Sequence, residues 1–476
     1  MAAHVMAHAD RLADKIALQV VGDKPETFTY GQLQSAIRGT ATGLLEQGLS
    51  PGDRLLMQLG NTPEFPITYL GAITAGIIPV PVSVQLTKPE LRKISETIKP
   101  AMTIIAKTGL NLRQLWTLPS ADYVMGDPNR PAYMVFTSGT SGQPRAVIHA
   151  HRAVWARQMM WDGWYGISQA DRLMHAGAFN WTYTLGTGLM DPWSVGATAL
   201  IPADGTPAEA LAHLLAEKDV TIFAAAPGVY RRLLRSTFCP LPALRHGLSA
   251  GEKLATALAD AWIQKTGTRI HEAFGMSECA TFISGSPTDA APPGNAGYAQ
   301  PGRKVAMIGP DGPVSFGEPG TIAIHRSDPG LMLGYHNAPT ETAARFQGDW
   351  FQTGDIGIMA ANGAITYAGR ADDMMNAGGY RVSPVEVEDA LTAHPLISEA
   401  AACAVQICAD TALIAAFYVP SDVIDEGELR DFVSARLAAY KCPRLYIAKD
   451  ALPRGANNKL LRRVLRQEWE TAHGQT

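Results

Sequence analysis

Two hydrophobic periodicities alternate along the first half of the chain. After Thr29, a residue type that favours a helix start, apolar residues recur at helical spacing up to a glycine. An apolar run over 54–59 is typical of a buried strand, and a helix over 63–77 and a strand over 79–84 follow. The order returns as a strand over 197–202, a helix over 207–217, a strand over 220–227 and a helix from Val229. This rhythm predicts an α/β fold whose sheets are largely parallel and covered by helices.

The pattern changes in the last third of the chain. The stretch 287–320 is dense in glycine and proline between short apolar runs, which predicts short strands joined by turns and a small β-barrel subdomain. Beyond GRADD at 369–373, we expect a helix over 384–392, strands over 400–407 and 413–418, a helix over 426–438 and a strand over 445–448. These elements predict a large N-terminal domain over 1–371 and a small α+β C-terminal domain over 372–476.

Length and composition narrow the class of protein. The 476 residues exceed what one hydrophobic core supports, and the net charge of −4 offers no basic excess for nucleic acid or anionic lipid. The five cysteines are scattered without a CxxC pair, so neither a zinc site nor a disulfide framework is indicated. The apolar stretch 70–84 contains two prolines and is too short for a bilayer, and the N-terminus lacks the apolar core of a signal peptide. We expect a cytoplasmic protein that neither binds nucleic acid nor inserts into a membrane.

One loop has a composition that points to anion binding. FTSGTSGQPRAVIHA at 136–150 combines small hydroxyl residues, two glycines and a following Arg145. Hydroxyl and backbone N–H groups of such a loop can surround an anion, so it predicts a phosphate site, although the P-loop pattern is missing. A polar surface turn is the alternative interpretation of this stretch alone. His149 and His151 lie two apart with no third ligand in view, and structural roles are expected for them.

Further motifs follow the loop in series. They are FGMSE at 274–278, GYHNAPTETAARF at 334–346, TGD at 353–355, GRADD at 369–373, GGYRVSPVEVE at 378–388, YKCPR at 440–444 and LPRGANNKLLRR at 452–463. A single motif of this kind is more often only a turn. Together, in this order and rough spacing, they resemble the adenylate-forming superfamily of acyl-CoA synthetases, luciferases and peptide-synthetase adenylation domains. The resemblance runs from about Tyr30 to Arg463.

The resemblance implies a site for ATP and Mg²⁺. Phe274 would stack on adenine, Asp355 would accept from the ribose hydroxyls, and Arg370 would be a second ribose or phosphate contact. Ser277 would donate to an α-phosphate oxygen, and Glu278 is a hard oxygen ligand suited to Mg²⁺. The implied ATP-binding residues are Thr137, Ser138, Gly139, Thr140, Ser141, Gly142, Arg145, Gly251, Glu252, Phe274, Gly275, Asp355 and Arg370.

The implied catalytic residues are Lys459, Glu278 and Ser277. Lys459 would bridge the substrate carboxylate and the α-phosphate, and one such preorganised donor is worth on the order of 10²–10³ in rate. The chain departs from the family pattern at Asn458, where glycine is usual, and at Arg145-Ala146, where Lys-Gly is usual. Asparagine tolerates positive φ and arginine keeps the charge, so activity is still expected.

The resemblance also implies a moving C-terminal domain. This domain would rotate about Asp372 between two half-reactions, so that Lys459 faces the site in the first and Gly378-Gly379-Tyr380 lines a pantetheine tunnel in the second. The expected CoA-binding residues are Gly378, Gly379, Tyr380, Tyr440, Lys441 and Arg444. A plain turn at Gly378-Gly379, and a solvated surface at Tyr440, Lys441 and Arg444, are the alternatives.

The acid pocket is expected among the segments 177–188, 223–230 and 249–252. Amino-acid-activating relatives usually have an Asp in the first segment, whereas Asn180 and Trp181 stand here, so a free amino acid is not expected. The aromatic side chains predict a compact acid, although they could be ordinary core residues. The expected pocket residues are Asn180, Trp181, Tyr183, Ala226, Ser249, Ala250 and Met276.

These residues predict an AMP-forming acid–CoA ligase for a small aromatic or a short- to medium-chain aliphatic acid, resembling benzoate-type and medium-chain acyl-CoA synthetases. ATP, Mg²⁺, CoA and the carboxylic acid are the expected partners, and a homodimer is left open. One alternative is an adenylate-forming enzyme that oxidises the acyl adenylate or passes it to a carrier protein or another acceptor. Another is a nucleotide-binding protein without turnover.

Overall fold

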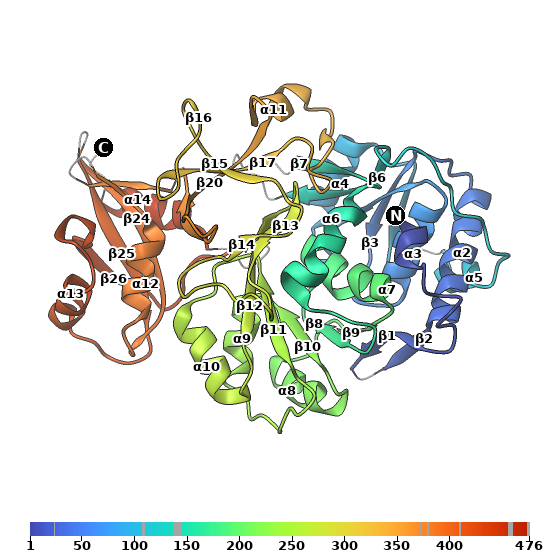
Figure 1. Ribbon diagram of the computed structural model, residues 1–476, viewed down its shortest axis with the longest axis horizontal. Coiled ribbons are helices and arrows are strands. Elements are labelled where there is room, and N and C mark those ends of the chain that lie inside the picture. Colours follow the sequence, from blue (N-terminus) through green and yellow to red (C-terminus); the bar gives the residue numbers. More distant parts are fainter. Residues whose placement is uncertain are drawn as a thin grey trace.

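The computed structural model describes residues 1–22, 24–106, 110–137, 145–371, 373–377, 380–408, 411–455 and 460–473. Figure 1 shows the N-terminal half of the chain at one end of the molecule and the C-terminal domain at the other. The short, mostly antiparallel strands that follow β14 lie above and between them. The mixed α/β class, with a large N-terminal and a small C-terminal domain, is as expected.

The largest sheet formed by the described residues has nine strands. Its order is β14 (Tyr298–Ala299), β13 (Ala280–Ser284), β12 (Ile270–Met276), β11 (His246–Ala250), β10 (Ile222–Ala225), β8 (Arg172–His175), β9 (Thr198–Pro202), β1 (Ile16–Val21) and β2 (Glu26–Thr29). The run from β12 to β1 is parallel, and the pairs at both ends of the sheet are antiparallel. The expectation of a largely parallel sheet is confirmed here. Parallel strands present their carboxyl ends at one edge, which is where ligand sites of open α/β sheets lie.

Two smaller sheets complete the N-terminal part. One is parallel, in the order β4 (Ile78–Pro81), β3 (Arg54–Gln58) and β5 (Met102–Ile105). The other is antiparallel, in the order β18 (Gly334–Tyr335), β7 (Arg145–Ala150) and β6 (Pro131–Thr137). β6 and β7 flank the predicted phosphate loop, most of which, at 138–144, lies outside the described residues.

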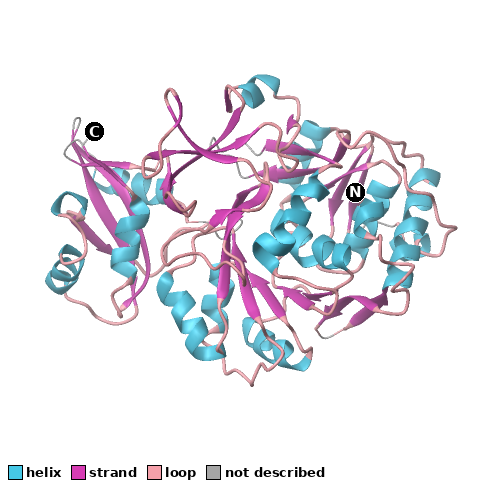
Figure 2. Ribbon diagram, in the orientation of Figure 1, coloured by secondary structure: helices cyan, strands magenta, loops and turns pink. Residues whose placement is uncertain are grey.

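Helices cover these sheets, as Figure 2 shows. In the N-terminal part they are α1 (Ala2–Val5), α2 (Tyr30–Glu46), α3 (Glu64–Thr74), α4 (Lys88–Ile98), α5 (Leu112–Leu115), α6 (Ala153–Met160), α7 (Asp191–Val195), α8 (Ala208–Glu217), α9 (Pro227–Leu233), α10 (Thr256–Thr266) and α11 (Pro339–Ala343). Two π-helical segments, Trp161–Tyr165 and Thr184–Met190, continue α6 and precede α7. Among the described residues, no helix is long and apolar enough to cross a membrane.

Helix α2 shows how local sequence fixes an element. Thr29 accepts from the backbone N–H of Gln32, while the Gln32 side chain accepts from the backbone N–H of Thr29, so two otherwise unpaired donors are satisfied. The buried side of the helix carries Tyr30, Leu33 and Ile37, at the spacing of one helical face. The helix start predicted at Thr29 is therefore confirmed.

The glycine- and proline-rich region forms a six-stranded sheet rather than a barrel. Its order is β16 (Gly312–Pro313), β15 (Val305–Gly309), β17 (Pro319–His325), β20 (Trp350–Met359) and β19 (Phe346–Gln347), with β21 (Ile365–Arg370) also paired to β20. Among the strands that the structure describes, none joins the two ends of this order into a ring, so the predicted barrel is wrong. The long strand β20 pairs with β17 over positions 350–358, while β19 pairs with positions 350–351 and β21 with positions 355–359.

The C-terminal domain matches its expected elements closely. Helix α12 (Pro384–Thr392) and strand β26 (Leu445–Ala448) have the predicted bounds, and β24 (Ile397–Cys408) and β25 (Thr411–Pro420) extend the two predicted strands. Helix α13 (Glu426–Ser434) is shorter than predicted, because the chain turns at 435–437, and a 3₁₀ turn at Ala439–Lys441 comes later. A hairpin of β22 (Met375–Ala377) and β23 (Tyr380–Val382) and the helix α14 (Arg462–His473) were not predicted. The domain boundary at 371/372 stays a prediction, and residue 372 lies outside the described residues.

Candidate active site

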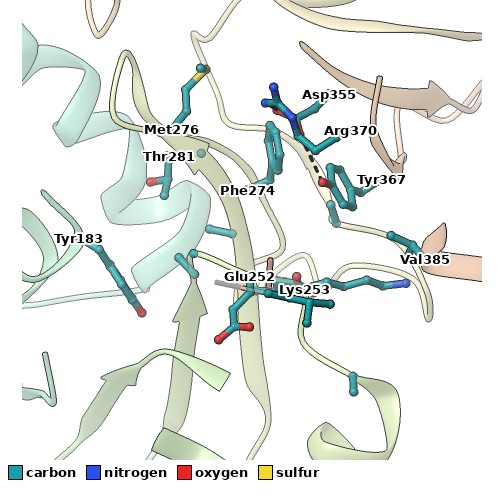
Figure 3. A pocket seen from close by; sticks show the side chains of 18 of the residues that line it. Tyr183, Glu252, Lys253, Phe274, Met276, Thr281, Asp355, Tyr367, Arg370 and Val385 are labelled. Atoms are coloured by element: carbon teal, nitrogen blue, oxygen red, sulfur yellow. Dashed lines mark hydrogen bonds and ion pairs between the residues drawn. The ribbon is translucent and has the colours of Figure 1, made fainter. Parts of the chain in front are cut away.

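A cavity of about 690 Å³ lies where the two parts of the chain meet. Its floor is the carboxyl end of the nine-stranded sheet, and one wall comes from the C-terminal domain through residues such as Val385, Glu399 and Arg454. Figure 3 shows side chains from both parts pointing toward this space. Fourteen of the predicted site residues line it: Thr137, Arg145, Trp181, Tyr183, Ala250, Gly251, Glu252, Phe274, Gly275, Met276, Ser277, Glu278, Asp355 and Arg370.

The residues predicted to hold the nucleoside lie together on one side of the cavity. Strands β20 and β21 pair so that Asp355 stands opposite Arg370, and the Arg370 Nη1 atom is 3.4 Å from Asp355 Oδ2. Tyr367 donates a hydrogen bond from its hydroxyl to Asp355 Oδ1 at 3.2 Å, drawn as the dashed line in Figure 3. The Phe274 ring lies 5.5 Å from the Tyr367 ring. A carboxylate, a cation and an aromatic face thus converge on this side of the cavity.

Tyr367 was not identified from the sequence. Burial, reinforced by the neighbouring Asp355 carboxylate, raises the pKa of its hydroxyl far above the usual range, so it remains a donor at any physiological pH. Only the pairing of two strands brings Tyr367 to Asp355, and no local pattern around position 367 signals this contact.

The predicted metal ligand Glu278 is held in a fixed position. Its side chain is 6% exposed, and the Tyr335 hydroxyl donates to its Oε1 atom at 2.8 Å. The guanidinium of Arg145 lies 5.3 Å from the centre of the Tyr335 ring and pairs with Glu341 at 2.6 Å. Strand β18, which carries Tyr335, pairs with β7, which begins at Arg145. Thus the end of the predicted phosphate loop and the FGMSE turn are joined through one tyrosine.

A buried histidine forms a hydrogen bond with the same FGMSE turn. His149 Nε2 donates to the backbone carbonyl of Ser277 at 2.7 Å, and burial lowers the pKa of His149 to about 4, so the ring is neutral. His151 Nδ1 instead accepts from the N-terminal ammonium of Met1 at 3.0 Å. Among the described residues there is no cluster of three or more metal-ligating side chains. Both histidines therefore make structural contacts in this structure.

Tyr183 lies on the side of the cavity away from Asp355 in Figure 3, and it forms an aromatic group with Trp181, which also lines the cavity. The Trp181 and Tyr183 rings lie 5.1 Å apart and nearly perpendicular, and the Tyr183 hydroxyl donates to the Leu248 carbonyl at 3.0 Å. Trp181 packs over Gly251, where a Cβ atom would lie only 2.7 Å from its ring. Three residues predicted for this pocket do not line the cavity: Asn180, Ala226 and the fully buried Ser249.

Ion pairs cross the cavity between the two domains. Arg454, in the C-terminal domain, lies 3.2 Å from Glu252 and 2.8 Å from Glu399, and Glu399 also pairs with Arg231 at 3.0 Å. Lys253 pairs with Asp389 of α12. Glu252, predicted as an ATP-binding residue, thus contacts the C-terminal domain in this arrangement. The partner Arg454 could not be found from sequence, because the two residues are 202 positions apart.

Two groups on the cavity wall, the half-buried Glu272 and the buried Arg157, were also missed. Burial raises the pKa of Glu272, which accepts from the Leu254 backbone N–H at 3.0 Å, to about 7. Arg157 forms a buried pair with Asp191, and its Nη2 atom lies 2.5 Å from Asp191 Oδ2. Arg157 could have been found from the sequence, because it is a charged residue within the largely apolar helix AVWARQMM.

Several predicted residues are placed elsewhere or lie outside the described part of the chain. Tyr440 is exposed, and Lys441 pairs with Glu386 at 2.8 Å; neither they nor Arg444 lines the cavity in this arrangement. The side chain of Tyr380 lies outside the described part. So do the residues Ser138, Gly139, Thr140, Ser141, Gly142, Asp372, Gly378, Gly379 and Lys459.

Comparison with known proteins places the chain in a family. Residues 5–336 match the AMP-binding enzyme family, and residues 386–459 match the AMP-binding enzyme C-terminal domain. The chain belongs to the AMP-binding enzymes, which confirms the resemblance to adenylate-forming enzymes drawn from its motifs.

Individual relatives cover almost the whole chain. The 3-hydroxybenzoate–CoA ligase of Aromatoleum sp. (strain CIB) is 28% identical, with 97% of each chain covered. The benzoate–CoA ligase of Thauera aromatica is 29% identical, covering 96% of this chain and 93% of its own length. The crystal structure of a benzoate CoA ligase from Burkholderia xenovorans LB400 has a TM-score of 0.87 at 28% identity, covering 98% of this chain and 99% of its own.

Proposed function

We propose that the protein is an AMP-forming acid–CoA ligase for a small carboxylic acid. It converts the acid and ATP to an acyl adenylate and pyrophosphate, and then converts the acyl adenylate and CoA to acyl-CoA and AMP. The observation that carries this proposal is that one cavity joins the Asp355, Tyr367 and Arg370 group, the buried Glu278 and an aromatic pocket. A nucleotide and a compact acid would thereby meet beside one carboxylate. The related benzoate- and hydroxybenzoate–CoA ligases support the same activity.

The first step joins the acid to AMP. An oxygen of the substrate carboxylate attacks the α-phosphorus of ATP, and the bond to pyrophosphate breaks. Asp355 accepts from the ribose hydroxyls, Tyr367 and Arg370 hold Asp355 in place, and Phe274 presents its ring to the base. Ser277 and Lys459 donate to the oxygens on which negative charge develops. Donors fixed in advance stabilise such a transition state because they need no reorganisation during the reaction.

The proposed metal ligand fits Mg²⁺. Mg²⁺ is commonly bound through one or two carboxylates together with substrate phosphates. Glu278 offers a buried carboxylate with Oε1 fixed by Tyr335, at the wall where Thr137 and Arg145 also lie. When bound, the ion would neutralise charge on the phosphates of ATP. Glu278 is the residue that would hold it.

The second step requires a different set of residues at the same carbonyl carbon. The CoA sulfur attacks this carbon, the thiol proton is lost, and AMP leaves with its carboxylate-derived oxygen. We propose that the C-terminal domain, 372–476, rotates about Asp372 between the steps. Arg454 and Leu460, on either side of Lys459 in the chain, line the cavity, which supports a role for this arrangement in the first step. Rotation would move Lys459 away from the reacting groups and place Gly378, Gly379 and Tyr380 there instead. It would also bring the other predicted CoA-binding residues, Tyr440, Lys441 and Arg444, toward CoA.

The acid is proposed to be a small aromatic or a short- to medium-chain aliphatic acid. Trp181, Tyr183 and Met276 give the pocket wide apolar surfaces. The nearby guanidinium of Arg454 is paired with Glu252 in the contact between the two domains. Pockets of this kind bind compact ligands through apolar contact with few polar groups.

The test is pyrophosphate release with Mg-ATP across a panel of acids, from acetate through octanoate to benzoates and cinnamates, with and without CoA. The proposal predicts release with one narrow group of acids, sustained only when CoA is present, and acyl-CoA as the product. Sustained release that ignores CoA would instead indicate a carrier protein or another acceptor. Tight ATP binding without release for any acid would overturn the proposed activity.

A further inference from the structure

A buried arginine forms part of the cavity wall beside the aromatic group. Arg157, on α6, is only 6% exposed, yet it reaches the cavity surface. Its Nε and Nη2 atoms donate to the two oxygens of Asp191 at 2.7 and 2.5 Å. The Tyr165 hydroxyl donates to the same carboxylate at 2.7 Å and lies 2.8 Å from the hydroxyl of Thr187, another cavity residue.

The third nitrogen of this guanidinium is available to a ligand. Within the part of the chain that the structure describes, Arg157 Nη1 donates to no atom, although each guanidinium nitrogen carries at least one N–H donor. Gly186 makes room for the group, since a Cβ atom at this position would lie 1.8 Å from Nη2. Nη1 is not among the fully buried unpaired atoms of the described residues, so it is open to the cavity. A ligand that packs against it and excludes solvent must supply an acceptor, because a buried donor left without a partner is costly.

The neighbours of Arg157 assign it to the acid rather than to the nucleotide. Met160, one helical turn further along α6, contacts the hydroxyl of Thr281, and Tyr165 packs in one buried cluster with Tyr183 and Ala250. The ribose group is built from Asp355, Tyr367 and Arg370, which lie on the paired strands β20 and β21 rather than on α6. Figure 3 shows Tyr183 and Thr281 on the side of the cavity away from Tyr367.

The charge balance defines the chemistry of the acceptor. Asp191 already compensates the guanidinium charge through two hydrogen bonds, so a second carboxylate would leave a net negative charge in a buried site. A neutral oxygen adds no charge and accepts a hydrogen bond from the N–H group of Nη1. A methyl group at the same place would leave this donor unsatisfied.

We propose that Arg157 is a specificity-determining residue, and that the acid carries a neutral hydrogen-bond acceptor, such as a hydroxyl, methoxy or keto oxygen, which binds Arg157 Nη1. This inference rests on the proposed function, because it names the substrate class of the same pocket. The ring or chain of the acid would pack against Trp181 and Tyr183 while its polar substituent meets the guanidinium.

The test compares acids that differ only in this acceptor. Initial rates of CoA-dependent AMP formation are measured for meta- and para-hydroxybenzoate against the corresponding methylbenzoates, for methoxy- against ethylbenzoates, and for a keto alkanoate against the branched alkanoate of the same shape. In at least one pair, kcat/KM should be about 10- to 100-fold higher for the acid with the oxygen. The corresponding benzene dicarboxylates should be poorer substrates than the hydroxybenzoates. Equal values in every pair, or a preference for the dicarboxylates, would overturn the proposal without any variant being made.

Variants then assign the preference to Arg157. Arg157→Lys keeps a cation for Asp191 but removes the nitrogen that would bind the acceptor. The kcat/KM ratio of the acid with the oxygen to the acid without it should therefore fall to about three or less, while kcat/KM for the acid without the oxygen stays the same. Gly186→Ala should displace the guanidinium and reduce the same ratio. Arg172→Lys, a similar change outside the cavity, is the matched control and should keep the ratio.

Each result separates the two proposals. If Arg157→Lys lowers kcat/KM equally for all acids, the guanidinium serves a part common to every substrate, and the specificity role is wrong. If this variant does not fold, the proposal is still tested by Gly186→Ala and by the kcat/KM ratios of the acid pairs with the unaltered protein. A protein that uses acids but ignores the substituent refutes only the inference, whereas a protein that activates no acid refutes the proposed function.

Discussion

Arg454 of the C-terminal domain lies 3.2 Å from Glu252 of the N-terminal domain, across the cavity in which the reaction is proposed to occur. Glu252 directly follows Gly251, over which Trp181 packs. The contact therefore links the position of the small domain to the wall of the acid pocket. Because Arg454 also binds Glu399, one guanidinium holds together residues from both domains.

Arg454→Gln should make the C-terminal domain leave its present position more readily, because it breaks the ion pair with Glu252. Both partners are about one-fifth exposed, so the pair is worth about 1 kcal/mol, which corresponds to roughly five-fold in the rate of adenylate formation. Higher salt should slow the unaltered protein more than the variant, because salt screens the pair. Single-turnover pyrophosphate release measures the first step. Arg430→Gln, which breaks a surface pair within α13, is the control. An equal loss in thioester formation from supplied acyl adenylate would contradict this interpretation.

Glu278→Gln should lower the rate of adenylate formation by on the order of 10²-fold, because the Mg²⁺ ion that neutralises the phosphates would lose its carboxylate ligand. Tyr335→Phe leaves the carboxylate in place but removes the hydrogen bond that orients it. This second variant should therefore raise the Mg²⁺ concentration needed for half-maximal rate, with a smaller loss at saturating Mg²⁺. Titration of pyrophosphate release with Mg²⁺ separates the two effects. An unchanged Mg²⁺ requirement in both variants would exclude Glu278 as the ligand.

Lys459→Ala should abolish most adenylate formation, with a loss on the order of 10²–10³, yet still allow thioester formation from supplied acyl adenylate. Lys459 lies outside the described residues, but its neighbour Leu460 lines the cavity. The two half-reactions are followed separately as pyrophosphate release and as acyl-CoA formation. Lys449→Ala, which removes a surface ion pair with Glu468, is the control. Equal losses in both half-reactions would refute the proposed division between the two domain positions.

Glu272 should make folding stability depend on pH. Burial raises its pKa from 4.5 to about 7, so between these values the folded protein holds a proton that the unfolded chain releases. The free energy of unfolding should therefore fall as pH rises through this window, by up to about 1.4 kcal/mol per pH unit, and this contribution should level off above pH 7. Glu272→Gln should remove that slope. Denaturant unfolding between pH 5 and pH 8 measures it, and an identical slope in the variant would contradict the assignment.

Local signals predicted the C-terminal domain better than the region before it. Ser383 accepts from the Glu386 backbone N–H and Pro384 begins α12, so this helix start is encoded within four residues. The barrel prediction failed for the opposite reason. Short apolar runs predict that strands exist, but closure depends on which edges pair, and β20 divides its edges among β17, β19 and β21.

The candidate site shows the same division. Ordered motifs identified Phe274, Glu278 and Asp355, because each lies in a short segment with a characteristic spacing. Tyr367 and Arg157 have no such segment. Tyr367 reaches the cavity through the pairing of β20 with β21, and Arg157 is held there by its contact with Asp191 at the start of α7. Contacts set by long-range packing leave little trace in the local sequence.

The most direct measurement of the central claim is exchange of radiolabelled pyrophosphate into ATP without CoA. An enzyme that forms an acyl adenylate must show exchange that depends on the acid, because the first step is reversible before any thiol is present. Addition of CoA should then yield AMP and acyl-CoA in equal amounts. ADP and phosphate as products, or exchange that needs no acid, would contradict the account.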